Sequence, residues 1–308
     1  MGALPSKPDH RDFRVSSFYR VDSVFPSEYM PDTLIEAESQ GNTQACVSFS
    51  IELQTAYHEL KERSVLERFD QNYIYGYRYD NHYKGEGMYP REAYAVLYRN
   101  GIPSRGILPF KGIQHYSQLA TYQFRPGVHS NAVFQRVKSY FALYHEREIK
   151  TALQHGPVGI CIPVYDSLNH CPANGLLPMP NTMRERLHGY HMMLIIGWTK
   201  GGHWVVQNSW KPWGDTQMSR YSMAYMPMNY PTQELWGVID EELPRPVRNM
   251  QFIADQPTAM INEEAVELET IPYMQDNEIM LPGRFLAEEL GAEVEQDGDI
   301  ITIKQYGS

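Results

Sequence analysis

A single cysteine stands at the start of a predicted helix, in the segment Gln40–Ser50. After Cys46, apolar residues recur at the spacing of one helix face: Phe49, Leu53, Ala56, Tyr57 and Leu60. This spacing predicts an amphipathic helix from Cys46 to about Arg63. A thiol at a helix N-terminus meets unpaired backbone N–H groups and the positive end of the helix dipole, and both favour the thiolate. Cys46 is therefore a candidate nucleophile, although a small buried hydrophobic side chain also fits this position.

Size and charge limit the class of protein. The 308 residues can form one large core or two unequal ones. The net charge of -10, without a basic patch, argues against a nucleic-acid partner or an anionic membrane surface. No run of about 18 apolar residues occurs, so we expect no membrane span. Residues 1–8 lack the apolar core of a signal peptide, and we expect a cytoplasmic protein, or a secreted or cell-surface one if a leader was removed.

Cysteine and histidine spacing bears on disulfides and metals. The three cysteines cannot form a disulfide framework, and a Cys161–Cys171 pair is the one bridge left open if Cys46 stays free. His188 and His191 form an H-x-x-H pattern, but no CxxC pair supports a zinc site beside it. We therefore predict no metal site and no cofactor.

Helical segments come first along the chain and strands come later. Residues 1–39 read as an extended wrapping segment, and helices are predicted at Pro90–Asn100 and at about 132–155. Strands are predicted at about residues 158–164, 191–198, 204–207 and 221–225. This order predicts an α+β protein with a helical half and a sheet half.

A second, smaller domain is predicted at the C-terminal end. We assign residues 1–245 to the first domain, 246–257 to an acidic, proline-bearing linker and 258–308 to the second domain. A hairpin, a short helix and two final strands joined at Asp297-Gly298 predict a small α+β domain. Since about 50 residues are marginal for an independent fold, we expect this domain to dock on the first one or on a partner.

Cys46 needs a base, and the base needs an orienting group. His191 begins an apolar strand, and Asn208 follows the next strand. We expect His191 to take the thiol proton and later deliver it to a leaving amine, while Asn208 fixes the ring tautomer. The amide of Gln40, six residues before Cys46, is the candidate oxyanion donor.

Three motifs together resemble the papain-like cysteine peptidases of the C1 family. The matching features are Gln40 with Cys46, His191 with Gly197, and Asn208-Ser209-Trp210 with Trp213-Gly214, over roughly residues 5–240. The resemblance implies a two-lobed fold, a helical lobe plus a β-sheet or barrel lobe. It also implies a cysteine endopeptidase that hydrolyses peptide bonds through a thioester intermediate.

The same resemblance implies a substrate-binding set. Cys161 and Met192 would form opposite walls of an apolar pocket that favours a hydrophobic side chain two residues before the cut. Gly87 and Met88 would pair with the substrate backbone. Trp210 would shield the hydrogen bond between the Asn and the His. Each of these positions is equally well explained as core packing.

The segment Met280–Val294 is similar to the copper amine oxidase N-terminal-like domain of many bacterial surface proteins. That module is an accessory, and its name implies no copper here, because no ligand cluster is present in this segment. The resemblance implies docking or substrate presentation and a bacterial or bacteriophage source. It also favours export over a cytoplasmic location.

Two other functions stay open. The same residues could serve an amidase, isopeptidase or transpeptidase that acts on cell-wall or modified peptides. A catalytically inactive binding protein is the other alternative, against which the four intact residues Cys46, His191, Asn208 and Gln40 weigh. The predicted partner is a peptide or protein substrate.

Overall fold

The computed structural model describes residues 2–9, 12–79, 82–240, 250–252, 254–261, 264–275, 278–289, 293–297 and 300–304. The chain divides into two compact units, Met1–Glu241 and Glu242–Ser308. No helix within the described ranges is long and apolar enough to cross a membrane.

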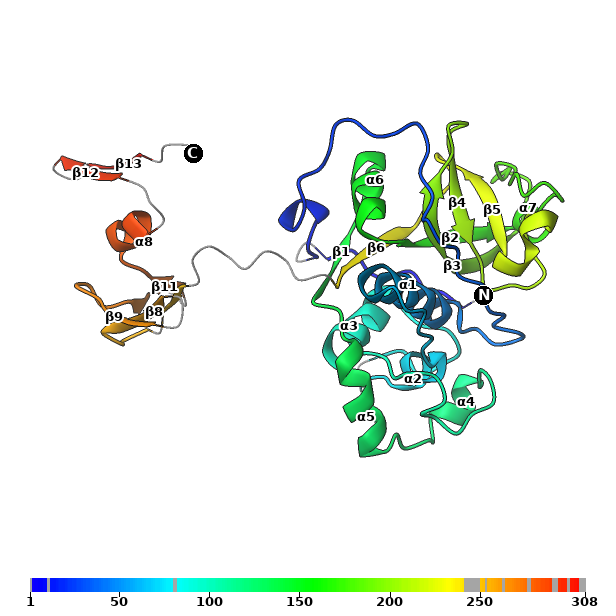
Figure 1. Cartoon of the computed structure of the whole chain (residues 1–308), viewed down its shortest axis with the longest axis horizontal. Helices are drawn as coiled ribbons and strands as arrows, with labels where there is room; N and C mark the ends of the chain where they lie inside the picture. The colour runs from blue at the N-terminus through cyan, green and yellow to red at the C-terminus, as the bar shows by residue number, and fades with distance from the viewer. Residues whose placement is uncertain are drawn as a thin grey trace. The chain divides into compact units, whose positions relative to one another are not determined.

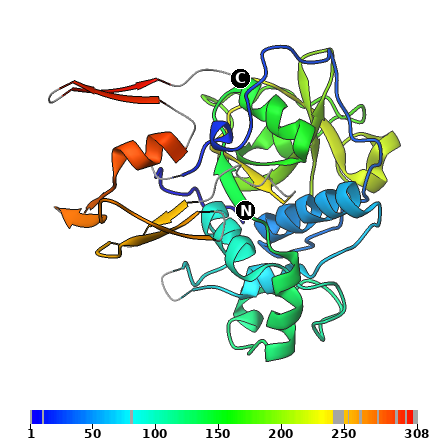
Figure 2. The same cartoon turned by 60° about the vertical axis from the view of Figure 1, so that its left-hand side comes forward.

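The helical half of the first unit is built around one long helix. It contains α1 (Cys46–Arg63), α2 (Gln71–Gly76), α3 (Pro90–Asn100), α4 (Tyr116–Leu119), α5 (Pro126–Ala132) and the 3-10 turn η2 (Val133–Gln135). Helix α1 has the predicted bounds and ends at Ser64, whose left-handed φ of 56° stops the helix. Figures 1 and 2 show α1 between α2–α5 on one side and the sheet on the other.

The position of α1 explains why it is buried beyond its apolar stripe. Every residue from Cys46 to Glu59 is buried, including the polar side chains Glu52 and Gln54. Gln54 donates to the carbonyl of Pro157 (2.7 Å), and Glu52 accepts from Arg68 (2.6 and 2.9 Å). Buried polar groups require such partners, so both faces of α1 are bonded to their surroundings.

The sheet half is a single six-stranded sheet in the order β1-β6-β2-β3-β4-β5, with all neighbours antiparallel. Its strands are β1 (Ser139–Ala142), β2 (Val158–Tyr165), β3 (Leu187–Trp198), β4 (His203–Gln207), β5 (Met223–Pro227) and β6 (Glu234–Ile239). Helices α6 (Glu146–His155) and α7 (Asp166–Asn169) and the 3-10 helix η3 (Thr216–Tyr221) connect them. The predicted α+β class is thus confirmed.

One stretch predicted as helical differs in the structure. Between residues 132 and 155, helix α5 ends at Ala132 and strand β1 precedes α6. Strand β1 pairs with β6, from Ser139 opposite Ile239 to Ala142 opposite Trp236. Neither strand was predicted, because each is short and is fixed by a partner almost 100 residues away rather than by its own sequence pattern.

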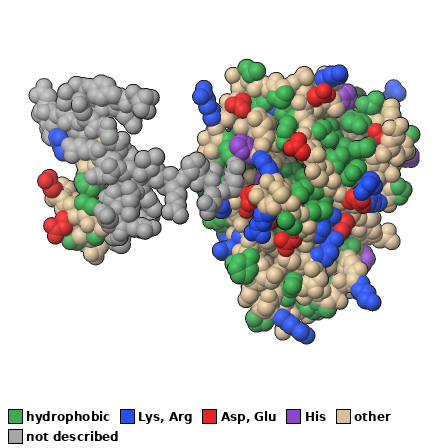
Figure 3. Space-filling view, in the orientation of Figure 1, with side chains coloured by type: hydrophobic (Ala, Val, Ile, Leu, Met, Phe, Trp, Pro, Cys, Tyr) green, Lys and Arg blue, Asp and Glu red, His purple; other side chains and the backbone are tan. Residues whose placement is uncertain are grey.

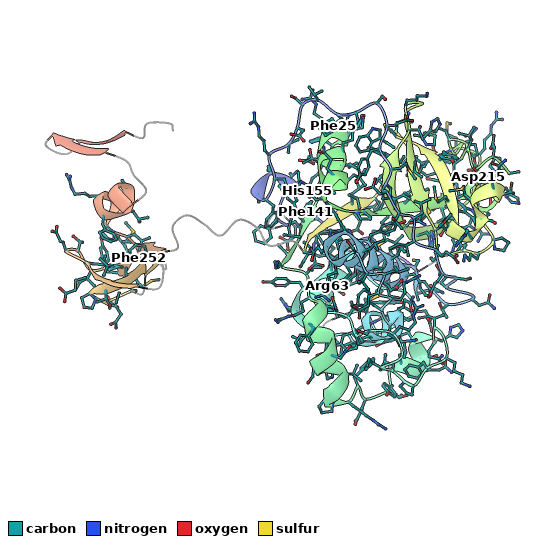
Figure 4. The ribbon with its side chains drawn as sticks, in the orientation of Figure 1. Phe25, Arg63, Phe141, His155, Asp215 and Phe252 are labelled. Carbon is teal, nitrogen blue, oxygen red and sulfur yellow. The ribbon has the colours of Figure 1, made fainter. Side chains whose placement is uncertain are left out.

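The N-terminal segment wraps around the sheet half through aromatic contacts. The ring centroid of Phe18 lies 5.7 Å from that of Phe141 on β1, and the ring centroid of Phe25 lies 6.3 Å from that of Trp198 on β3. Figure 4 labels Phe25 and Phe141, which come from this segment and from β1. A short 3-10 turn, η1 (Val15–Ser17), is its one helical element in the described part, as expected for an extended wrapping segment.

The described part of the second unit consists of small antiparallel sheets and one helix. Its elements are β7 (Met250–Phe252), β8 (Thr258–Ile261), β9 (Glu264–Glu267), β10 (Tyr273–Gln275), β11 (Glu278–Met280), α8 (Gly283–Glu289), β12 (Glu293–Asp297) and β13 (Ile300–Lys304). Strands β7–β9 form one sheet, and β10–β11 and β12–β13 form two hairpins. Strand β7 falls inside the segment predicted as a linker, where it pairs with β8. The Gly298 of the predicted turn and the helix end at Leu290-Gly291 lie outside the described residues.

Candidate functional site

The candidate nucleophile is the first residue of α1. A turn at Gly41, whose φ is 55°, leads into the helix, and Cys46 follows Ala45 at its N-terminus. The side chain of Cys46 is fully buried in the core cluster that also contains Met192 and Cys161. The helix therefore presents its unpaired N–H end at the thiol, as the sequence predicts.

The candidate base and its orienting group are brought together. Nε2 of His191, on β3, lies 2.6 Å from Oδ1 of Asn208, which follows β4. An amide oxygen only accepts, so Nε2 carries the proton and Nδ1 is left with a lone pair. Nδ1 is buried without a hydrogen-bond partner among the described residues. The ring of Trp210 stacks on the imidazole at 4.2 Å and covers this pair.

Gln40 connects the two sides of the site. Its Oε1 accepts from Oγ of Ser209 (2.7 Å), and its backbone N–H donates to the Ser209 carbonyl (2.9 Å). Its Nε2 donates to the carbonyl of Thr43 (2.7 Å). Because a side-chain amide carries two N–H groups, one of them is not used by this bond. The segment before α1 and the segment after Asn208 are thus held in one geometry.

Burial at the site acts against the expected thiolate–imidazolium pair. Burial raises the pKa of Cys46 to about 11, and backbone groups of Met192, Gly2 and Val47 oppose this only in part. Burial likewise lowers the pKa of His191 to about 4, against the raising effect of Asn208. Burial therefore favours the neutral thiol and the neutral imidazole, because both charged forms lose the stabilisation of water.

The chain's own N-terminal segment lies beside the site, and the backbone of Gly2 is within hydrogen-bonding reach of the Cys46 thiol. Ala3 donates to the carbonyl of Tyr190 (3.2 Å) and forms a parallel bridge with Met88. Met88 in turn donates to the carbonyl of Gly2 (2.9 Å). A Cβ on Gly2 would lie 2.0 Å from the carbonyl oxygen of Gln44, so this close approach requires glycine. Sequence reasoning treated residues 1–39 as a wrap and missed this contact.

The predicted substrate-binding residues lie on paired strands of the sheet and beside the N-terminal segment. Cys161 and Met192 are directly opposed in the pairing of β2 with β3, and both are fully buried. Gly87, with a φ of 89°, and Met88 contact the N-terminal segment through their backbones. Glu234 of β6 lies opposite Cys161 in the sheet, and sequence reasoning missed it because β6 was not predicted.

The residues considered for zinc or a disulfide do not come together. His188 hydrogen-bonds to Asp166 at 2.6 Å, whereas His191 is paired with Asn208. No group of three or more His, Cys, Asp or Glu side chains that could hold a metal ion occurs in the part of the chain that the structure describes. Cys46, Cys161 and Cys171 are all free thiols.

Comparisons with solved structures show which fold this is. Xylellain, a cysteine protease from Xylella fastidiosa, matches with a TM-score of 0.67 and 16% identity over 78% of this chain and 96% of that one. Procathepsin B S9 from Trypanosoma congolense matches with a TM-score of 0.59 and 16% identity, over 78% of this chain and 86% of that one. Bromelain from Ananas comosus, in complex with the E64 inhibitor, matches with a TM-score of 0.54 and 15% identity, over 70% of this chain and 100% of that one. These likenesses confirm the predicted papain-like fold.

Family models match both parts of the chain. Residues 245–305 match the copper amine oxidase N-terminal domain, as predicted for the tail. Residues 31–228, more than half of the chain, match the papain family cysteine protease model. No curated protein sequence is significantly similar to the chain. The predicted enzyme class, a hydrolase, is confirmed at the level of the family: this chain belongs to the papain family of cysteine proteases.

Proposed function

We propose that the first unit is a cysteine endopeptidase in which Cys46, His191, Asn208 and Gln40 carry out the reaction. One observation carries the proposal: Asn208 holds the Nε2 proton of His191 at 2.6 Å and leaves Nδ1 buried and unpartnered. An unpaired buried acceptor lowers the stability of the fold, so its presence calls for an explanation such as a catalytic role. A buried proton acceptor is what a nucleophilic cysteine needs, and Cys46 is a buried thiol at a helix N-terminus.

The reaction then follows from the positions of the groups. Nδ1 of His191 takes the thiol proton, and Sγ of Cys46 forms a bond to the carbonyl carbon of the peptide. The free N–H of Gln40 and the backbone N–H of Cys46 bind the oxyanion. When the C–N bond breaks, His191 gives its proton to the amine and a thioester remains. His191 then removes a proton from water, and the water oxygen attacks the thioester carbon. The C–S bond breaks, the acid is released, and His191 returns the proton to Sγ of Cys46.

A peptide can reach Cys46 only after residues 2–4 leave. The N-terminal segment occupies the backbone partners Met88 and Tyr190, which an extended substrate would use. Its departure admits water and removes the desolvation that keeps the thiol and imidazole neutral. We therefore assign the ion pair to the open site and the neutral pair to the closed one.

Thiol labelling tests the proposal directly. An iodoacetamide-type probe, read by intact mass between pH 4 and 9, is applied to the Gly2→Ala protein, in which the added methyl group weakens the seating of the segment. We expect single, fast labelling of Cys46 below pH 7 and much slower labelling when His191→Ala is added. Cys171→Ala serves as the control and should leave the rate unchanged. Labelling of Cys46 no faster than of Cys171, with the pH profile of a free thiol, would contradict the ion pair and the proposed function.

A further inference from the structure

The residue that meets the N-terminal segment, Met88, lies in an isolated bridge and not in a strand of the sheet. Its N–H donates to the carbonyl of Gly2 at 2.9 Å, and its carbonyl accepts from the N–H of Leu4 at 3.0 Å. A pairing of only two short segments is marginally stable by itself. The position of Met88 therefore depends on the parts of the chain on either side of it, α3 and residues 83–87.

Residues 83–87, all of which the structure describes, contain no helix, no strand and no cysteine. Tyr83 and Lys84 are exposed, and Gly85 and Glu86 are half-buried, so the core holds little of this segment. The three cysteines of the chain are free thiols and add no disulfide to it. Its conformation is held instead by side-chain hydrogen bonds from α2 and from a residue just after α2.

The hydroxyl of Tyr75 makes two of these hydrogen bonds. Tyr75 lies on α2 and is fully buried. Its O–H donates to Oε2 of Glu86 at 2.6 Å and accepts from the N–H of Gly87 at 3.0 Å. Gly87 has a φ of 89°, so the turn at this point is one that a side chain would strain. One hydroxyl group therefore fixes both of the residues that precede Met88.

The guanidinium of Arg78 holds the first part of the segment. Its Nη1 donates to the carbonyls of Tyr83 (2.7 Å) and Gly85 (2.9 Å). Its Nε donates to the carbonyl of Tyr75 (3.0 Å), and its Cζ lies 3.7 Å from the ring centroid of Tyr116 on α4. The planar fork of N–H groups suits arginine to such a set of carbonyls, and the aromatic ring stabilises its charge. Arg78 thus connects α2, α4 and the segment in one place.

We infer that Tyr75 and Arg78 are positioning residues that hold Met88 ready to pair with the backbone of an extended peptide. This inference rests on the proposed function and deepens it. A segment that is already ordered loses no further conformational freedom when the peptide binds. A segment that is correctly placed for only part of the time binds more weakly by that fraction. Because the two side chains act through Met88 and not on the reacting atoms, their loss should raise KM and leave kcat nearly unchanged.

Peptide binding tests the inference without turnover. The full chain carrying Gly2→Ala and Cys46→Ala is titrated with a hexapeptide that has Leu two residues before the bond, and with three analogues of it. Each analogue is N-methylated at one of the three residues before the bond, which removes one backbone N–H. We expect one methylation to weaken binding by roughly tenfold, because that N–H donates to the carbonyl of Met88. Adding Tyr75→Phe should weaken binding of the unmodified peptide by roughly tenfold, and binding of that analogue by less than about threefold.

Two further variants serve as a check and a control. Arg78→Lys keeps the positive charge but loses the fork of N–H groups, so it should also weaken binding of the unmodified peptide. This variant decides the question if Tyr75→Phe does not fold. Tyr73→Phe, on the same helix, removes a hydroxyl that is hydrogen-bonded to Nδ1 of His129 (2.9 Å) and should leave all affinities unchanged.

Hydrolysis separates this inference from the proposed function. In the Gly2→Ala protein with Cys46 intact, Tyr75→Phe should raise KM by roughly tenfold and change kcat by less than about twofold. Cleavage with an unchanged KM in both Tyr75→Phe and Arg78→Lys would overturn the positioning role and leave the endopeptidase proposal standing. Binding that depends on Tyr75 without any cleavage would overturn the endopeptidase proposal while supporting the positioning role.

The binding series has its own contrary outcomes. Unchanged affinity in Tyr75→Phe and Arg78→Lys, or an equal loss in Tyr73→Phe, would overturn the positioning role. An equal loss for the unmodified peptide and all three analogues would do the same, because the effect would then not pass through the pairing with Met88. Failure of the unmodified peptide to bind the full chain would also overturn it.

Discussion

The two compact units bury very different amounts of apolar side chain. In Met1–Glu241 one continuous sheet packs with α1 in a core cluster that reaches from Ala3 to Val238. In the described part of Glu242–Ser308 the cluster has two buried residues, Ala259 and Leu268, with three partly buried side chains packed on it. Phe252, labelled in Figure 4, and Phe285 make its one aromatic pair, at 6.2 Å. A small domain has too little interior for more.

Charge divides between the units just as unevenly. Met1–Glu241 contains 23 acidic and 23 basic residues, so the whole net charge of -10 belongs to Glu242–Ser308. On the face in Figure 3 the charges of both signs are interspersed over the first unit. All 11 histidines also lie in the first unit.

The difference shows what a large core makes possible. Burying a thiol, an imidazole and an amide in water-free surroundings costs free energy, and only a unit with much apolar burial can offset it. The first unit has that excess and uses it at the site of Cys46, His191 and Gln40. The described part of the second unit has few buried side chains, so we expect its acidic residues to act at its surface.

The largest effect should come from removing the candidate nucleophile. We expect Cys46→Ala to lower kcat/KM on a peptide substrate by roughly 10⁴-fold or more, because no other group can form the thioester. Cys171→Ala, a thiol outside the site, should change it little. Activity that survives Cys46→Ala while the protein remains folded would mean that the first unit is not where the chemistry occurs.

The pH dependence of stability should differ between the units. Burial lowers the pKa of His191 to about 4 from its unfolded value near 6.5, so between these values the unfolded chain binds more protons. Acidification from pH 6.5 to 4 should therefore lower the free energy of unfolding of the first unit by roughly 3 kcal/mol through this group. Asp240, whose pKa is raised by burial to about 7, acts in the opposite direction.

The contribution of His191 is isolated by difference. Calorimetry of wild type and His191→Gln at several pH values gives the difference in their free energies of unfolding. This difference should change by roughly 3 kcal/mol between pH 6.5 and 4. The transition of the second unit, which contains no histidine, should be the same in both proteins. His82→Gln is a useful comparison, since burial lowers the pKa of His82 to about 4 as well. A difference in free energy of unfolding that does not vary with pH would mean that water already reaches His191.

A smaller effect is expected at the N-terminal segment. Gly2→Ala places a methyl group against the backbone of Gln44, and overpacking of this kind costs about 1–3 kcal/mol. The closed state should therefore become less populated, and labelling of Cys46 should accelerate by roughly tenfold. Gly127→Ala, where a Cβ meets nothing within 4 Å, is the matched control. Equal rates for Gly2→Ala and wild type would show that the segment does not limit access.

The smallest effect should follow removal of the second unit. A chain that ends at Glu241 should fold and hydrolyse a short neutral peptide within about twofold of the full chain, because each unit has its own core. On a Lys- and Arg-rich protein substrate at low salt, the same truncation should reduce kcat/KM measurably. An insoluble truncated chain would show that the first unit does not fold independently of the second.

Local sequence determined the elements whose signals lie within one stretch. Helix α1 begins at Cys46 and ends at Arg63, and α3 spans Pro90–Asn100, because apolar periodicity and terminating residues are short-range properties. The spacing of Gln40, Cys46, His191 and Asn208 likewise indicated a family, and the structure brings His191 and Asn208 into a hydrogen bond.

Tertiary structure alone decided the state of that site. The sequence favours a thiolate at Cys46, yet burial of its side chain raises the pKa of the thiol to about 11. Strands β1 and β6 exist because they pair with each other, and β6 brings Glu234 into line with Cys161. Desolvation and strand register depend on what packs from elsewhere in the chain, and no local pattern encodes either.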